Sequence, residues 1–156
     1  MTSTADVRGD YRYTLTRTWD TDRDSVVFIM LNPSIADASV DDPTIRRCIS
    51  FAKREGFGGI IVVNLYAFRA TDPQAMFAAV DPVGPDNDRI IANAVAGRTV
   101  IAAWSSYAHP ARVAQVLALL PGTASLRCLG VTKGGHPRHP LYVRGDAPLI
   151  PWPADG

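Results

Sequence analysis

Four short apolar runs constrain this chain more than any other feature of its sequence. None shows the alternation of polar and apolar residues that marks a strand with one face in water. Strands that are apolar throughout belong in a sheet covered on both faces, and such sheets are usually parallel. The runs are Ser25–Leu31, Gly59–Asn64, Thr99–Trp104 and a weaker one, Ser125–Gly130.

Helical patterns separate these runs. After Asp42 and Pro43, which suit the N-cap and the first helical position, apolar residues recur at helical spacing as far as Gly56. The segments Pro85–Ala96 and His109–Leu120 have the same character. Strands alternating with helices predict an α/β fold, a three-layer α/β/α sandwich. Numbering the four runs along the chain, we expect a central parallel sheet in the order 2-1-3-4.

The N-terminal part differs from the rest. Tyr11–Trp19 alternates, with Tyr13, Leu15, Arg17 and Trp19 on one face, which predicts a half-exposed strand that pairs antiparallel at an edge of the sheet. Residues 1–10 are polar, and we expect them to be flexible. The 156 residues are predicted to form a single domain, in which the proline-rich segment Gly130–Pro153 is a long loop.

Composition limits the classes of partner. The net charge is +1, whereas proteins that rely on non-specific phosphate contacts are usually more basic, so any contact with nucleic acid should be local and short. Cys48 and Cys128 lie in apolar surroundings and are expected to be buried free thiols, which suits a cytoplasmic location. The start of the chain lacks the apolar core of a signal peptide, and no apolar run reaches the length of a membrane span.

Unusual polar and aromatic residues follow each apolar run. In a parallel sheet these strand ends share one edge, where ligands bind. We therefore expect Asn32, Asn64 and one of His136 or His139 to line one cleft. The candidate site residues are Asn32, Pro33 and Ser34 after the first run; Asn64, Tyr66, Phe68 and Arg69 after the second; Trp104 after the third; and Lys133, His136, Arg138 and His139 after the fourth.

Each candidate has a functional and a structural interpretation. The amide of Asn32 can hold a water molecule, or Asn32-Pro33 can simply form a turn. Tyr66 and Phe68 can stack on a base or cover the core. Arg69 suits a phosphate, and a carboxylate such as Asp72 would serve it equally well.

The histidines stand in a segment of glycines, prolines and cations. A histidine there can donate to a developing anion, or the segment can be a solvated surface loop. No carboxylate or cysteine accompanies His136 and His139, so we predict no metal. Asp37 and Asp41 remain candidates for a general base or a metal ligand. The chain has no glycine-rich phosphate loop, and we expect no cofactor.

The stretch Arg12–Tyr142 closely resembles a bacterial and phage family, domain of unknown function 1643. The resemblance rests on Asn32-Pro33-Ser34, on Asn64-Leu65-Tyr66 and on the segment His136–Tyr142. The family name itself implies no activity.

A more distant resemblance is to the uracil-DNA glycosylase superfamily. It implies that Asn32, before Pro33, positions the attacking water, and that Asn64 to Pro73 with Arg69 is the loop after the second strand. His136-Pro137 or His139-Pro140 would match the loop that stabilises the leaving base. The chain departs from the superfamily in having Trp104 near the place of a common glycine and Arg138-His139 where a small serine is usual. It also lacks cluster-binding cysteines.

Three functional hypotheses follow. The first is a uracil-DNA-glycosylase-like hydrolase acting on the N-glycosidic bond of a modified or damaged base in DNA. In it Asn32 positions water, a histidine stabilises the departing base, and Arg69 and Lys133 hold phosphates. The second is a nucleotide- or nucleobase-binding module without catalysis that uses the same pocket. The third is a structural partner in a phage or mobile-element system.

Overall fold

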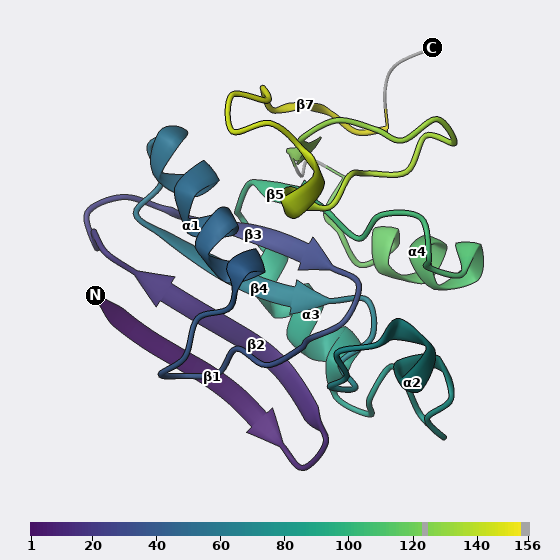
Figure 1. The fold of residues 1–156 in the computed structure, drawn as a ribbon. Helices are drawn as coiled ribbons and strands as arrows, with labels where there is room; N and C mark the ends of the chain where they lie inside the picture. Colours follow the sequence, from purple (N-terminus) through teal and green to yellow (C-terminus); the bar gives the residue numbers. More distant parts are fainter. Residues whose placement is uncertain (123–124, 154–156) are drawn as a thin grey trace.

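One mixed sheet forms the centre of the molecule (Figure 1). The computed structural model describes residues 1–122 and 125–153, and within them seven strands pair in the order β1-β2-β4-β3-β5-β6-β7. Their bounds are β1 (Thr2–Arg8), β2 (Tyr11–Thr18), β3 (Ser25–Met30), β4 (Gly59–Asn64), β5 (Val100–Ala102), β6 (Leu126–Cys128) and β7 (Ile150–Pro151).

The four apolar runs form the parallel part of the sheet, with β3 between β4 and β5, and β6 beyond β5. Successive residues of β3 point into different cores, which is why the run is apolar throughout. Val26 and Phe28 belong to one buried cluster, and Val27 and Ile29 belong to the other. The carboxyl ends of these strands consequently meet at one edge.

Helices cover both faces of this parallel part. They are α1 (Pro43–Arg54), α2 (Pro73–Phe77), α3 (Asn87–Val95), α4 (Pro110–Leu117) and the short 3₁₀ helix η1 (Pro140–Tyr142). Ile45 and Phe51 of α1 pack in the cluster of Phe28, whereas Ile91 of α3 and Val116 of α4 pack in the cluster of Ile29. The sheet is therefore the middle of three layers.

The caps explain where two of the helices begin. The prediction for α1 is confirmed: a side-chain oxygen of Asp42 accepts from the Ile45 amide at 2.8 Å, and Pro43 follows it. The short helix α2 was not predicted; there the Asp72 side chain accepts from the Gln74 backbone amide at 2.9 Å. Asp72 is thus a helix cap and not the partner of Arg69.

Two expectations for the N-terminal part are wrong. Residues 2–8, for which no strand was expected, form β1, which pairs antiparallel with β2. That pairing makes β1 the edge strand and places β2 between β1 and β4. We expected Tyr11–Trp19 at the edge of the sheet, but β1 holds that position, although its own sequence is mostly polar and shows no strand pattern.

The predicted alternation of β2 is also interrupted. Val7 pairs with Arg12 and Asp6 pairs with Thr14, so Tyr13 is an extra residue that forms a bulge. Tyr13 packs against Ile90 of α3, while Leu15 packs in the cluster on the α1 side. Because a bulge shifts the alternation, residues on its two sides no longer follow one pattern.

The segment Gly130–Pro153, predicted to be a long loop, contains two short elements. These are η1 and then β7, which pairs antiparallel with β6 at the far edge of the sheet. Cys128 of β6 and Cys48 of α1 are buried free thiols, as predicted. Among the described residues, no helix combines the length and apolar character needed to cross a membrane.

Candidate functional site

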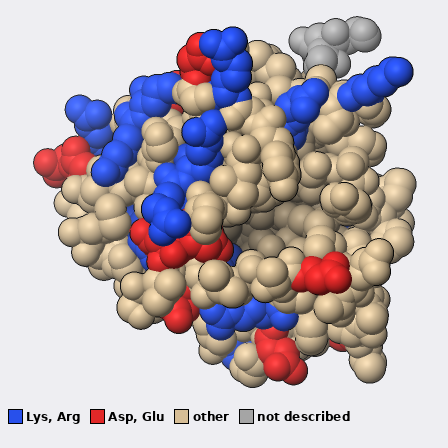
Figure 2. All heavy atoms as spheres, viewed as in Figure 1, with Lys and Arg blue, Asp and Glu red and all other residues tan. Residues whose placement is uncertain are grey.

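A cavity of about 700 Å³ opens at the carboxyl ends of β3 and β4, on the α1 side of the sheet. Its walls come from the segments that follow β3, β4 and β5, from the start of α1, and from η1. Figure 2 shows the surface hollowed there, with mostly uncharged walls.

The cavity brings together some of the predicted site residues. Asn32, Asn64 and His139 line it, as predicted, and so do Ser34 and Trp104. Their chemical roles remain predictions. Pro33, Tyr66, Phe68, Arg69, Lys133, His136 and Arg138 are not among the residues that line it.

Asn64 is the polar group at the end of β4. Its side chain is 1% exposed, yet neither its amide nitrogen nor its amide oxygen has a hydrogen-bond partner in the protein. Its backbone oxygen is bound from the other face of the sheet, where the side-chain amide nitrogen of Asn87 donates to it at 2.9 Å. A buried amide without partners is costly, so this one is suited to pair with a ligand in the cavity.

Asn32 is held in one orientation. Its amide nitrogen donates to the backbone oxygen of Ala70 at 2.8 Å and to that of Pro33 at 3.1 Å. Both of its hydrogens are thereby used. The amide oxygen is left as the acceptor that this residue offers to the cavity.

His139 presents a defined tautomer. Its Nδ1 accepts from the Leu141 amide at 3.1 Å, so the neutral ring carries its proton on Nε2. Burial lowers the pKa of His139, and the nearby charge of Asp42 opposes that shift. At neutral pH the ring is therefore uncharged and can donate from Nε2.

Three charged residues that line the cavity, Arg12, Asp42 and Asp72, were not among the predicted site residues. Arg12 is 3% exposed and lines the cavity, its Nη1 donates to the Ala36 oxygen at 2.8 Å, and its Nε has no partner. Burial lowers the pKa of Arg12 to about 10, with Asp42 opposing, so it stays charged at neutral pH. Asp42, besides capping α1, also lines the cavity. Nothing in the alternation of β2 marks Arg12, because the bulge at Tyr13 is invisible in the sequence.

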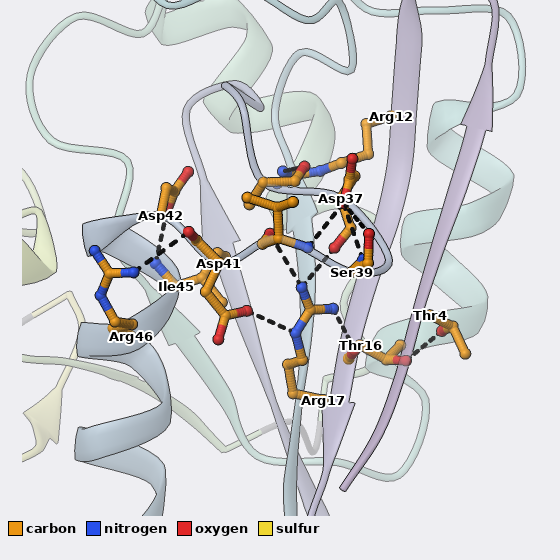
Figure 3. Close-up of polar contacts among 12 residues, drawn as sticks. Thr4, Arg12, Thr16, Arg17, Asp37, Ser39, Asp41, Asp42, Ile45 and Arg46 are labelled. Atoms are coloured by element: carbon orange, nitrogen blue, oxygen red, sulfur yellow. Dashed lines mark hydrogen bonds and ion pairs between the residues drawn. The ribbon is translucent and has the colours of Figure 1, made fainter.

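Arginines hold the loop between β3 and α1 (Figure 3). Arg17 is 1% exposed, donates to Asp41 at 2.8 Å and also reaches the backbone oxygens of Asp37 and Val40. Arg69 donates to the Ser34 oxygen at 2.7 Å and to the Ile35 oxygen at 3.0 Å. The partners of Arg69 within the chain are therefore backbone carbonyls of this loop.

The acidic residues of that loop also have structural partners. Asp37 accepts from the Ser39 and Val40 amides, each at 2.9 Å, and these bonds lower the pKa of its carboxyl. Asp41 pairs with Arg17. Neither lines the cavity, so neither has the position that a general base would need. Across residues 1–122 and 125–153 no group of three or more His, Cys, Asp and Glu could hold a metal ion.

The predicted aromatic residues cover the core. Tyr66 is 4% exposed, its hydroxyl accepts from the His109 amide at 3.2 Å, and Phe68 packs edge-on against Tyr11. Trp104 is buried edge-on against Trp152, although it also forms part of the cavity wall. Two other aromatic residues of the cavity wall, Tyr107 and Tyr142, are exposed.

The two predicted histidines lie in different surroundings, His136 on an exposed part of the tail loop and His139 at the cavity. Lys133, His136 and Arg138 are exposed, and the loop is held by backbone bonds from Thr132 to His136 at 2.8 Å and from Ser105 to Pro137 at 2.8 Å. Of the two histidines, His139 is the one that lines the cavity.

The molecule is thus an α/β protein with a cavity of mixed polar and apolar lining at the carboxyl edge of its parallel strands. A family model described as "Protein of unknown function (DUF1643)" matches residues 12–141, and the chain belongs to that family. No curated protein matches the chain significantly, and no solved structure does so either.

Proposed function

We propose that the cavity binds a nucleobase and that the protein hydrolyses the N-glycosidic bond of a modified or damaged base in DNA. The observation that carries this proposal is the buried amide of Asn64, which has both a donor and an acceptor without partners at the cavity wall. The resemblance of Asn32-Pro33 to the first-strand motif of uracil-DNA glycosylases supports the same reaction.

A nucleobase suits this wall chemically. The edges of the bases carry hydrogen-bond donors and acceptors side by side, which is the complement of a side-chain amide. The cavity volume of about 700 Å³ lies within the range of sites that enclose small ligands. Ala70, Phe77 and Leu141, which line the cavity and are not fully buried, give the wall apolar area against which a flat ring can pack.

The reaction needs a placed water and a stabilised leaving group. In glycosidic cleavage the sugar becomes cation-like and the base leaves with the bonding electrons, so water need only be placed. The free amide oxygen of Asn32 would accept a hydrogen bond from that water, whose oxygen forms the new bond to the sugar carbon as the N-glycosidic bond breaks. The proton that the water loses ends on the departing base, so the products are the free base and a sugar hydroxyl. His139 would donate from Nε2 to the departing base, and the charge of Arg12 would favour the anion.

The second candidate is a nucleobase-binding module without catalysis. It is favoured by the two carboxylates of the cavity wall, because Asp42 and Asp72 both cap helices and are held by backbone amides. Neither is thereby free to turn toward a water. Base release decides between the two candidates.

The test uses oligonucleotides that each carry one modified or damaged base, with released base detected by mass spectrometry. Binding of the matching free nucleosides is measured in parallel by calorimetry. Asn64→Ala should lose nucleoside binding, whereas Asn93→Ala, at an exposed position of α3, should behave as the parent. Binding without release in the parent would support the binding module. Absence of both would contradict both candidates.

A further inference from the structure

The near-neutral charge of the chain conceals a strong separation of charge. Helix α1 and the tail segment Gly130–Gly145 together hold seven of the 16 Lys and Arg residues and none of the 15 Asp and Glu residues. The other parts of the chain are therefore acidic. The seven cations are Arg46, Arg47, Lys53, Arg54, Lys133, Arg138 and Arg144.

These two segments lie side by side. Arg47 donates from Nε to the Pro140 oxygen at 3.1 Å and from Nη2 to the Val143 oxygen, and Arg54 donates to the Gly145 oxygen at 3.0 Å. Their surface is called the basic face below. In Figure 2 most of the visible Lys and Arg side chains lie on the side of the hollow where α1 and the tail run, with acidic side chains among them and a further basic group on the opposite side. A local patch of this kind supplies the short phosphate contact that the net charge alone would not predict.

The basic face is continuous with the cavity. Thr44 and Ile45 of α1, and His139 and Leu141 of the tail, belong both to these two segments and to the cavity wall. A phosphate backbone lying on the basic face would consequently pass the opening, within reach of the base that enters it.

The opening also carries exposed aromatic rings. Tyr142 of η1 is 75% exposed and Tyr107, between β5 and α4, is 68% exposed, and both line the cavity. Leu141, beside Tyr142, is 41% exposed. Aromatic side chains in contact with water next to a cationic surface are the arrangement on which unpaired bases stack.

We infer that the basic face and the two tyrosines bind single-stranded nucleic acid. This rests on the proposed function only in that the strand delivers the base to the cavity. Bases in a duplex already stack on one another, so the tyrosines would have no free base to contact. Extrusion of a base from a duplex also costs free energy that a strand without stacking does not require, and few cations are present to offset it.

The experiment measures fluorescence anisotropy of a labelled oligonucleotide that carries no modified base. It compares single-stranded DNA, the same sequence as a duplex, and single-stranded RNA. The single strands should bind more tightly than the duplex, and Tyr142→Ala should weaken their binding roughly tenfold. Arg46→Gln combined with Arg138→Gln should reduce the slope of log affinity against log salt by about 1.4, since single strands contribute about 0.7 per phosphate contact.

Matched controls keep this test independent of folding. Arg89 and Arg98 are exposed and lie at α3, on the other side of the sheet, so Arg89→Gln combined with Arg98→Gln should leave affinity and salt slope unchanged. Thermal unfolding of each variant should resemble that of the parent, because the altered side chains are exposed.

Three results would overturn the inference: a duplex bound as tightly as the single strand, tyrosine and charge variants that bind like the controls, or no binding to any strand. Tighter binding of RNA than of DNA would support the single-strand surface and name RNA as its ligand. If base release persists while strand binding fails, the inference falls and the proposed function stands. If strands bind but neither nucleoside binding nor base release is found, the proposed function falls and the inference stands.

Discussion

The loop between β3 and α1 and the loop after β6 both reach the cavity, but they are held in different ways. The first is anchored by side chains, because Arg12, Arg17 and Arg69 donate to its backbone oxygens from the body of the fold. In the second, the part from Gly130 to Arg138 is held mainly by its own backbone bonds, with a bridge between Val131 and Pro137, and the arginines of α1 donate only to its later part. The cations of the first loop's anchors are largely buried, whereas those of the second loop are exposed.

The difference teaches which residues can form a precise site. Asn32 stands at the start of the clamped loop, and both amide hydrogens are fixed by backbone oxygens. In the second loop the bridge turns the segment around Gly134 and Gly135 outward, which carries His136 away with it. His139 lies beyond the bridge, where it begins η1 and returns to the cavity.

The largest effect is expected from removal of a buried anchor of the first loop. Arg17→Met should lower the free energy of unfolding by about 3 kcal/mol, because it leaves buried carbonyls and Asp41 without their donor. Urea unfolding measures this change. A loss below about 1 kcal/mol would show that the loop does not depend on its arginine anchors.

The comparison variant in the second loop is Arg144→Met, which removes an exposed arginine instead of a buried one. Arg144 pairs with Asp146 in water, with side chains 86% and 72% exposed. Such pairs contribute little, so unfolding by urea should be unchanged within error. Equal losses in the two variants would contradict the distinction between the two kinds of anchor.

The next effect is on chemistry. Asn32→Ala should slow base release a hundredfold or more, since it removes the acceptor that would place water, while nucleoside binding stays nearly unchanged. Single-turnover cleavage beside equilibrium binding measures both quantities. Ser39→Ala, in the same loop but away from the cavity, is the control. Cleavage at the rate of the parent would make Asn32 a turn residue only.

The comparison also explains how far the sequence could lead. The parallel strands and α1 were predictable, because continuous apolar runs and the cap at Asp42 are local signals. The candidates at the strand ends followed from those strands, so Asn32 and Asn64 could be named in advance, and the histidine could be narrowed to His136 or His139 but not chosen. They lie together because parallel strands end at one edge.

The residues that were missed depend on contacts between distant segments. Arg12 reaches the cavity because the bulge at Tyr13 shifts the alternation of β2, and β1 exists because it pairs with β2. Arg69 appeared suited to a phosphate, but the loop between β3 and α1 offers it backbone oxygens that no periodicity reveals. The composition gives only the net charge of +1. It does not reveal that the cations gather on a basic face while the rest of the chain is acidic.

A third prediction separates the two histidines. His139→Ala should slow base release about a hundredfold by removing the donor from Nε2, whereas His136→Ala should leave it unchanged, because His136 is exposed and does not line the cavity. The ratio of the two single-turnover rates is the measurement. Equal slowing in both variants would mean that the second loop acts as a whole and not through His139.

The pH dependence of stability should follow His139 as well. Burial holds its pKa in the folded protein below the ordinary 6.5, whereas the unfolded chain takes up the proton near 6.5. As the pH falls from 6.5 toward the folded pKa, the unfolded state binds more protons and stability declines. Urea unfolding above and below 6.5 should show a larger decline for the parent than for His139→Gln. Equal declines would contradict the buried, neutral histidine.

The smallest effect concerns the far end of the first loop, where Asp42 caps α1. Asp42→Ala should lower the free energy of unfolding by about 1 kcal/mol, because the Ile45 amide loses its acceptor, while Asp42→Asn should retain most of that stability. The two variants remove the same charge from the cavity beside Arg12, so their difference isolates the cap. Nucleoside affinity, measured in the same variants, then reports the charge: a change of affinity shared by Ala and Asn is electrostatic, and a change in Ala alone is structural. If Asn destabilises as much as Ala, the carboxylate acts through its charge, and the cap contributes nothing measurable to the loop.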